Sequence, residues 1–160
     1  LRTDNNEQLI PENDAMILDI AISPDSQLMA SVNNKGRCYI WSLTYDNESS
    51  TIMVPKHKFE AHKRHALKCK FSPDSDLLIT TSADQTAKIW NTSDFSILQE
   101  LKQENQRWVW DAVFSADGQY VFTASSDGFA KLWNVKSGSM EREYSGHQKA
   151  VTALAFRDAS

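Results

Sequence analysis

The chain has 160 residues, of which 41% are apolar and 24% are charged, a composition that is typical of a folded globular protein and excludes extensive disorder. A formal net charge of −4 gives no general electrostatic attraction for nucleic acid or for an anionic membrane, and no apolar run is long enough for direct membrane insertion. The two cysteines lack metal-site or disulfide spacing and no signal-peptide pattern is present, which together favour a reducing, intracellular compartment.

Residues 1–10 are predicted to be the outer strand of a preceding group, and the first group of strands then covers residues 16–58. It begins with "MILDIAI" (16–22) and continues through "SPDSQLMASVNNKGRCYIW" (23–41). Ser-Pro-Asp-Ser is typical of a type I turn with proline at its second position. The polar segment "TYDNESSTIMVPKHK" (44–58) predicts a long surface insert with a short outer strand at its end.

Two further groups, residues 62–101 and 108–144, repeat this order. Their central segments are "SPDSDLLITTSADQTAKIW" and "SADGQYVFTASSDGFAKLW", and in all three groups a serine stands 18 residues before a tryptophan. Short β-branched and aromatic runs precede and follow each central segment, so every group is predicted to hold four short antiparallel strands. Residues 147–160, with "AVTALAF", predict the first strand of another group.

Four strands in a repeat of roughly 43 residues are the pattern of a β-propeller blade, which predicts an all-β fold. The dipeptides "AH" (61–62) and "GH" (146–147), and the tryptophans that end the third strands, give the chain a resemblance to the WD-repeat family. The aspartate that follows the tryptophan in the family pattern is replaced by serine or asparagine. Because a propeller closes with roughly four to eight blades, three complete repeats are expected to form part of a larger ring.

The resemblance also implies a buried structural tetrad in the second repeat. Its members would be His62, Asp84, Trp90 and Thr80, with Ser82 as an alternative to the threonine. A hydroxyl, an imidazole and a carboxylate can also form a catalytic triad, but a buried network around an indole N–H is the interpretation that we favour. The chain is therefore not expected to be an enzyme.

The other repeats keep only part of this tetrad. The third retains Asp127 and Trp133 but has Asn105 in place of the histidine, the first has Lys35 in place of the aspartate, and His147 belongs to the last, incomplete repeat. Removal of the histidine is therefore expected to destabilise the protein more than removal of the asparagine.

The segment 56–70 is rich in basic residues and histidines, which raises a zinc site and a nucleic-acid patch as alternatives. The possible ligands His57, His62, His65 and Cys69 match no common zinc spacing, and the basic run has little aromatic interleaving. A solvated loop of mixed charge is the preferred interpretation. No cofactor, metal or nucleic-acid partner is expected.

The stretch "NQRWVWDAVF" (105–114) places two tryptophans at the start of a first strand. By alignment with the other repeats, Trp108 and Trp110 are predicted to lie at the top surface, with Val109 pointing into the blade. One alternative is that they only fill the channel mouth. The preferred hypothesis is a partner-binding anchor, to which His65, Leu67 and Arg107 also contribute.

Longer strings, among them "FSPDSDLLITTSADQTAKIW" and "REYSGHQKAVTALAF", are similar to the small seven-bladed subunits of the target-of-rapamycin (TOR) kinase complexes. This resemblance implies about half of a seven-bladed ring and a non-catalytic scaffold that binds and stabilises the kinase domain, with other subunits, in TOR complexes 1 and 2. It also implies a cytoplasmic protein that partners recruit to lysosomal or other endomembranes. The alternative is a general WD-repeat adaptor, such as a ubiquitin-ligase substrate receptor or a G-protein-beta-like subunit.

Overall fold

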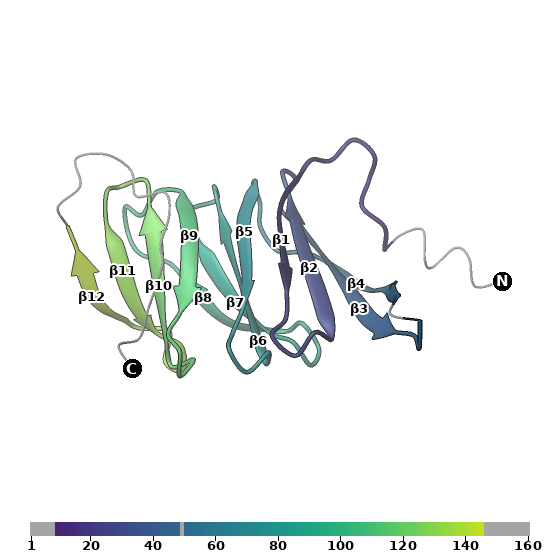
Figure 1. The fold of residues 1–160 in the computed structure, drawn as a ribbon. Helices are drawn as coiled ribbons and strands as arrows, with labels where there is room; N and C mark the ends of the chain where they lie inside the picture. The colour runs from purple at the N-terminus through teal and green to yellow at the C-terminus, as the bar shows by residue number, and fades with distance from the viewer. Residues whose placement is uncertain (1–8, 49, 146–160) are drawn as a thin grey trace.

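A computed structural model describes residues 9–48 and 50–145, whose strands form three four-stranded antiparallel sheets (Figure 1). In each sheet the strands lie side by side in chain order. The first sheet contains β1 (Ile17–Ile22), β2 (Leu28–Asn33), β3 (Arg37–Tyr45) and β4 (Thr51–Glu60). The second contains β5 (Ala66–Phe71), β6 (Leu77–Ser82), β7 (Ala87–Asn91) and β8 (Ile97–Leu101). The third contains β9 (Val109–Phe114), β10 (Tyr120–Ser125), β11 (Ala130–Asn134) and β12 (Met140–Tyr144).

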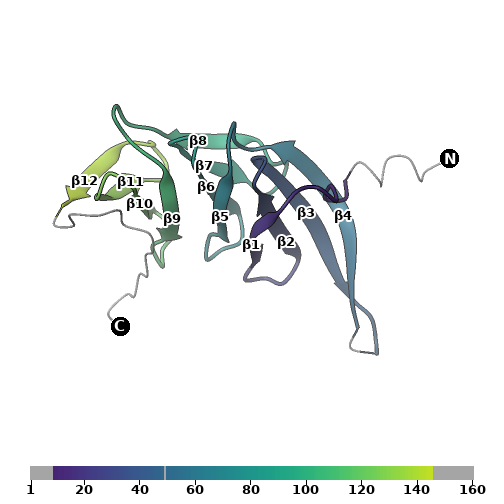
Figure 2. The same ribbon diagram turned by 90° about the horizontal axis from the view of Figure 1, so that it is seen from above.

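The three sheets stand next to one another along an arc, as blades of a propeller do (Figure 2). Strands β1, β5 and β9 line the inner side of the arc and contact one another in that order, while β4, β8 and β12 lie on the outer side. The predicted all-β blade architecture is confirmed. The strand expected within 147–160, residue His147 and most of the segment 1–10 lie outside the described residues.

The core of the protein lies between the blades. One apolar cluster joins the first two blades and includes Val32, Ile40, Leu78 and Trp90. A second cluster joins the second and third blades and includes Ile89, Leu101, Val109 and Trp133. Since burial of one such aliphatic or aromatic side chain contributes roughly 1.5–3 kcal/mol, these two clusters hold neighbouring blades rigidly together.

The turn between the first and second strands has the same hydrogen bonds in every blade. The hydroxyl of Ser23, Ser72 or Ser115 donates to the aspartate two residues later at 2.6 Å and accepts the backbone N–H of the residue five positions later. The Ser-x-Asp sequence therefore sets the same geometry three times, which explains why the repeat is visible in the sequence.

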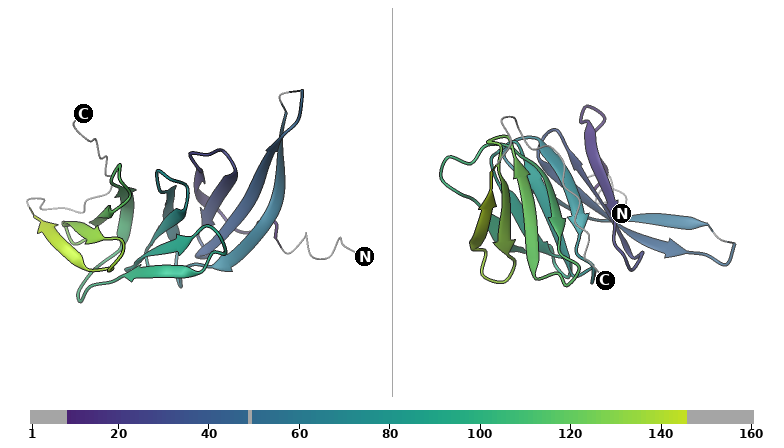
Figure 3. Two further views of the ribbon diagram at one scale, coloured as in Figure 1. Left: turned by 90° about the horizontal axis from the view of Figure 1, so that it is seen from below. Right: turned by 60° about the vertical axis from the view of Figure 1, so that its left-hand side comes forward.

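The segment 44–58 forms an extended hairpin, where the composition predicted mainly a surface loop. Thr44 pairs with Ile52 and Tyr45 with Thr51, so that only a short connection remains between the two strands. There Asp46 accepts the backbone N–H groups of Glu48 and Ser50 at 3.0 and 2.8 Å. The apolar run after the connection favours strand over loop despite the polar residues around it. The hairpin projects away from the blades (Figure 3, left).

Candidate partner-binding face

The predicted tetrad residues of the second blade lie together in one hydrogen-bonded chain. The indole N–H of Trp90 donates to the hydroxyl oxygen of Thr80 at 3.0 Å, and His62 Nε2 lies 2.7 Å from that oxygen. His62 Nδ1 lies 2.9 Å from Asp84 Oδ2. With an ionised Asp84, the consistent pattern has the threonine O–H donating to Nε2 and the Nδ1–H donating to the carboxylate, which requires a neutral histidine.

Asp84 is held in its ionised form. Burial by itself raises the pKa of this carboxyl group, but the hydrogen bonds from His62 and Thr86 outweigh burial and hold the pKa well below its ordinary value. Thr80 and His62 are buried, so that no substrate can reach the hydroxyl and imidazole of this network. Its chemistry is therefore that of a structural clamp between the loop before β5 and the β6–β7 turn.

Ser82, the alternative to Thr80, makes a different contact. Its hydroxyl donates to the carbonyl oxygen of His65 at 2.8 Å and accepts the backbone N–H of Asp84 at 2.9 Å. It links the start of the inner strand to the turn, whereas the indole N–H of Trp90 donates to Thr80.

In the third blade a lysine and a glutamine take the place of the histidine. Trp133 donates to the hydroxyl of Thr123 at 2.9 Å, as its counterpart does in the second blade. Asp127, however, accepts from the buried ammonium of Lys131 at 2.7 Å, and Lys131 also donates to Gln106 Oε1 at 3.2 Å. Burial raises the pKa of Asp127, but the hydrogen bonds from Lys131, Ser125 and the backbone N–H of Phe129, with the charge of Lys131, together outweigh burial and hold the pKa below its ordinary value.

Sequence reasoning missed Gln106 and Lys131. Asn105, which aligns with His62, adopts a left-handed backbone conformation with φ of 64°, and the next residue, Gln106, is the buried one. Its side-chain N–H group donates to the carbonyl of Gln85 at 2.8 Å, which joins the third blade to the turn of the second. A glutamine beside the missing histidine was the available signal, whereas Lys131 resembled an exposed strand residue.

The first blade has no comparable network among the described residues. The hydroxyls of Ser31 and Tyr39, which align with Thr80 and Lys88, are buried without a hydrogen-bond partner in the described chain. Lys35, which replaces the aspartate, points outward and pairs with Asp14 at 2.7 Å and with Glu12 at 3.1 Å.

A groove on the surface crosses the three blades at the end that carries the β2–β3 and β6–β7 turns. Its volume is about 390 Å³, and we call it the basic groove; it is lined by Asn34, Lys35, Lys63, Arg64, His65, Ala83 and Trp108. The positions of His65 and Trp108 are fixed by their backbones, because their carbonyl oxygens accept the N–H groups of Ala83 and Ser126 at 3.0 and 2.9 Å.

Gly36 positions the loop that carries the cations of the groove. Its carbonyl oxygen accepts the backbone N–H groups of Ala61 and His62 at 3.0 and 2.9 Å. A Cβ atom at Gly36 would lie 2.6 Å from the carbonyl oxygen of Arg64 and closer still to that of His62, and φ is +83°. Only glycine allows the β2–β3 turn of the first blade to approach the entry loop of the second so closely.

A β-bulge occurs at the same place in all three inner strands. The register shifts past Leu18 in β1, past Leu67 in β5 and past Trp110 in β9. A bulge changes the direction of the extra side chain and is frequent beside binding sites. It places the Trp110 ring against that of Trp108, with centroids 5.3 Å apart and an interplanar angle of 55°. Val109 between them is fully buried in the core.

The structure brings together only part of the predicted partner-binding set. Trp108, of which 39% is exposed, lines the basic groove with His65, and Trp110 supports Trp108 from the side. Arg107 is exposed but does not line the groove, and Leu67 is partly buried within β5. The groove adds Lys63 and Arg64, which the sequence reading had assigned only to a solvated loop.

The possible zinc ligands of the segment 56–70 do not converge. His57 stacks on Phe95 with ring centroids 5.4 Å apart, His62 belongs to the tetrad, and the Cys69 thiol is buried between blades. Among residues 9–48 and 50–145, no group of three or more potential ligands could hold a metal ion.

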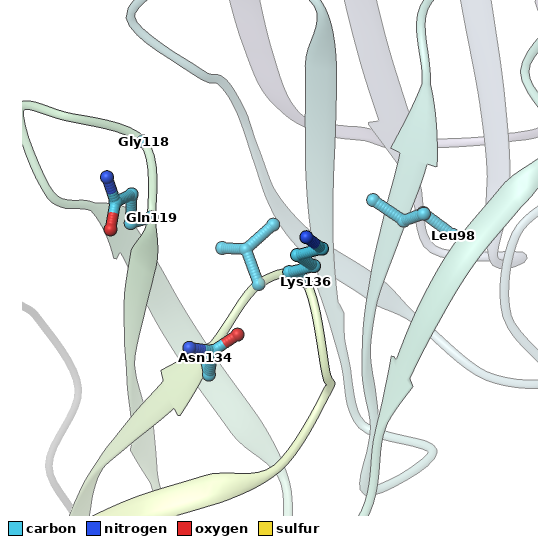
Figure 4. A pocket seen from close by; sticks show the side chains of 6 residues that line it. Leu98, Gly118, Gln119, Asn134 and Lys136 are labelled. Carbon is cyan, nitrogen blue, oxygen red and sulfur yellow. The ribbon is translucent and has the colours of Figure 1, made fainter.

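A second depression of about 570 Å³ lies at the opposite end of the blades (Figure 4). Leu98 of the second blade faces the β9–β10 and β11–β12 turns of the third across it; the other lining residues are Gly118, Gln119, Asn134, Val135 and Lys136. A similar depression in the second blade is lined by Asp76, Leu77, Asn91, Thr92 and Ser93. Because it recurs at equivalent positions, this depression is a consequence of blade geometry and carries no particular chemistry.

The blades, the tetrad and the recurring turns define the class of protein. The family model described as "WD domain, G-beta repeat" matches residues 7–42, 53–91 and 95–134, and the chain belongs to this WD-repeat family. In the part of the chain that the structure describes, no helix has the length and hydropathy that a membrane span requires.

Comparison with individual proteins confirms the resemblance to subunits of the TOR kinase complexes that the sequence indicated. The chain is 58% identical over 158 residues to "Protein LST8 homolog" of Drosophila melanogaster, covering 99% of this chain and 50% of the relative. It is 55% identical over 167 residues to "Target of rapamycin complex subunit LST8" of Mus musculus, covering 99% and 51%. It is 44% identical over 152 residues to "Target of rapamycin complex subunit wat1" of Schizosaccharomyces pombe, covering 94% and 48%. The chain thus spans about half the length of the curated relatives that it matches.

Proposed function

We propose that this chain is part of a non-catalytic WD-repeat subunit of the TOR kinase complexes 1 and 2, and that it binds the kinase domain through the basic-groove face. Two relatives that are 55% and 44% identical to it over the aligned residues are named as subunits of the target of rapamycin complex. Other subunits of the complexes would contact the same protein, and we expect a cytoplasmic assembly that partners recruit to lysosomal or other endomembranes.

The observation that carries this proposal is the exposure of Trp108. Trp108 is 39% exposed and lines a groove, and tryptophan is over-represented among interface hot spots. The backbone bond to Ser126 and the ring of Trp110 hold Trp108 in place before any partner binds. A fixed aromatic side chain loses little conformational entropy on binding, which suits it to be an anchor.

Stabilisation of the kinase would follow from the stiffness of the blades. The clusters between the blades and the networks around Trp90 and Trp133 resist deformation. A rigid surface that fits one arrangement of a kinase domain better than another shifts the population toward that arrangement. No catalytic group on this chain is needed for such an effect.

The experiment that tests the proposal compares two exposed aromatic residues in the intact protein. Trp108→Ala should reduce co-precipitation of the TOR-type kinase by at least tenfold, because truncation of an interface hot spot commonly costs about 2 kcal/mol or more. Tyr45→Ala is the matched control, since Tyr45 is also exposed but lies on the projecting hairpin. Equal kinase recovery with wild type and Trp108→Ala, both folded, would contradict the proposal.

A further inference from the structure

We infer that the basic groove binds an acidic segment of the partner, in which one or two carboxylates pair with Lys63 and Arg64 and a neighbouring apolar side chain packs on Trp108. This inference rests on the proposed function, because it names the chemistry of the kinase segment that the groove face would receive. The groove is lined by no acidic side chain.

The cations of the groove differ in whether they are already neutralised. Lys35 is paired with Glu12 and Asp14, so that its charge is largely satisfied within the chain. The side chains of Lys63 and Arg64 are exposed and form no ion pair within the described residues. These two positive charges are therefore available to a carboxylate from outside, on a protein whose net charge is −4.

The backbone that carries these cations is fixed in advance. The N–H of Lys63 donates to Asp84 Oδ2 at 3.2 Å, which ties the loop to the tetrad. On the other side, Gly36 accepts from Ala61 and His62 and lies directly against the carbonyl of Arg64. A loop held at both sides loses little further entropy when an extended acidic segment binds to it.

The groove also has a direction. At the Lys35 end the ammonium is already paired with Glu12 and Asp14 and offers little charge to an approaching anion, while Trp108 presents an apolar surface beside His65. The acidic residues of the partner segment should consequently lie over Lys63 and Arg64, with the apolar residue over Trp108. A partner segment that carries both an acidic and an apolar residue would therefore contact the two cations and Trp108 at the same time.

A protein segment fits these features better than a nucleic acid or an anionic membrane does. Those polyanions need many cations spread over a wide surface, and the groove offers two unpaired cations and one lysine that is already paired with Glu12 and Asp14. One aromatic side chain is also too few for a stacking platform of successive bases. One or two carboxylates of a protein match the two free charges in number.

The test reverses the two free charges in the intact protein and measures kinase binding at several salt concentrations. K63E/R64E should weaken binding by roughly tenfold or more at low salt and remove most of its salt dependence. K63Q/R64Q should have a smaller effect in the same direction. K56E/K136E changes the net charge equally at exposed lysines outside the groove and should bind as wild type. Unchanged melting temperatures establish that the variants are folded.

Replacement of acidic residues in the bound kinase segment by lysine should restore binding to K63E/R64E, as expected for a direct charge pair. Loss of kinase with Trp108→Ala but normal binding and salt dependence with K63E/R64E would overturn this inference and leave the proposed function intact. Normal binding by both variants would contradict both. Binding of the wild-type protein to phosphatidylserine vesicles that K63E/R64E abolishes, with kinase binding unchanged, would replace the acidic segment by a membrane surface.

Discussion

The imidazole of His62 lies between Thr80 and Asp84 and joins a hydroxyl of a strand to a carboxylate of a turn through its two nitrogens. The His62 and Thr80 side chains are buried and the Asp84 side chain is 8% exposed, so that the network is largely shielded from bulk water. In the third blade the turn aspartate is also held by a buried hydrogen bond, but its donor is Lys131, which donates to Gln106 as well as to Asp127. Substitution of His62 in the second blade is therefore expected to have a different effect on stability from substitution of Asn105, its counterpart in the third.

His62→Ala is expected to lower the free energy of unfolding by about 2–3 kcal/mol, because it takes one hydrogen bond each from the Thr80 hydroxyl and the Asp84 carboxylate and leaves a cavity between them. Asn105→Ala should change it by less than about 1 kcal/mol, since no described side chain depends on the asparagine. Urea unfolding of the intact protein measures both. Equal losses of stability in the two variants would show that His62 is not the centre of the clamp.

Lys131 and Asp127 should respond unequally to truncation. Asp127→Ala leaves the buried ammonium of Lys131 with only Gln106, and an uncompensated buried charge costs roughly 3–5 kcal/mol. Lys131→Met keeps the apolar stem and removes the charge, so that it should cost clearly less than Asp127→Ala. Thermal unfolding of the two variants and of the double variant measures the difference. A larger loss for Lys131→Met would contradict the burial of the charge.

The repeat made most of the fold predictable, because the Ser-x-Asp turn recurs with its hydrogen bonds in every blade and a tryptophan stands in the third strand of each. The spacing of His62, Thr80, Asp84 and Trp90 was likewise visible as a pattern. What escaped prediction depends on contacts between repeats or on pairing. The bulge at Trp110 is defined only by the register of β9 and β10, and Lys131 could be recognised as buried only once Asp127 was placed beside it.

Gly36 illustrates a residue whose importance depends on a neighbouring repeat. Gly36→Ala should destabilise the protein by at least about 3 kcal/mol, because the new Cβ meets the backbone of the entry loop as well as an unfavourable positive φ. Gly118→Ala is the control, since Gly118 also has a positive φ, +71°, but no atom lies within 4 Å of its Cβ position. It should cost only about 1–2 kcal/mol. Denaturant unfolding that gives equal losses would refute the close approach of the two blades.

Acid should destabilise the tetrad through Asp84. Its pKa in the folded protein lies below the ordinary value of 3.8, so the ionised form is favoured by folding. The resulting stabilisation is fully present above the unfolded pKa and is lost as the pH falls from about 4 through the folded value. Asp84→Asn removes this contribution, and its free energy of unfolding should therefore depend less steeply on pH between about 4 and 2 than that of the wild type. Asp76→Asn, at an exposed aspartate whose carboxylate makes no hydrogen bond or ion pair within the described residues, removes the same charge outside the tetrad and is the matched control, which should keep the wild-type slope. Urea unfolding at a series of pH values gives both slopes, and an Asp84→Asn slope equal to that of the wild type would show that the carboxylate gains nothing from His62 and Thr86.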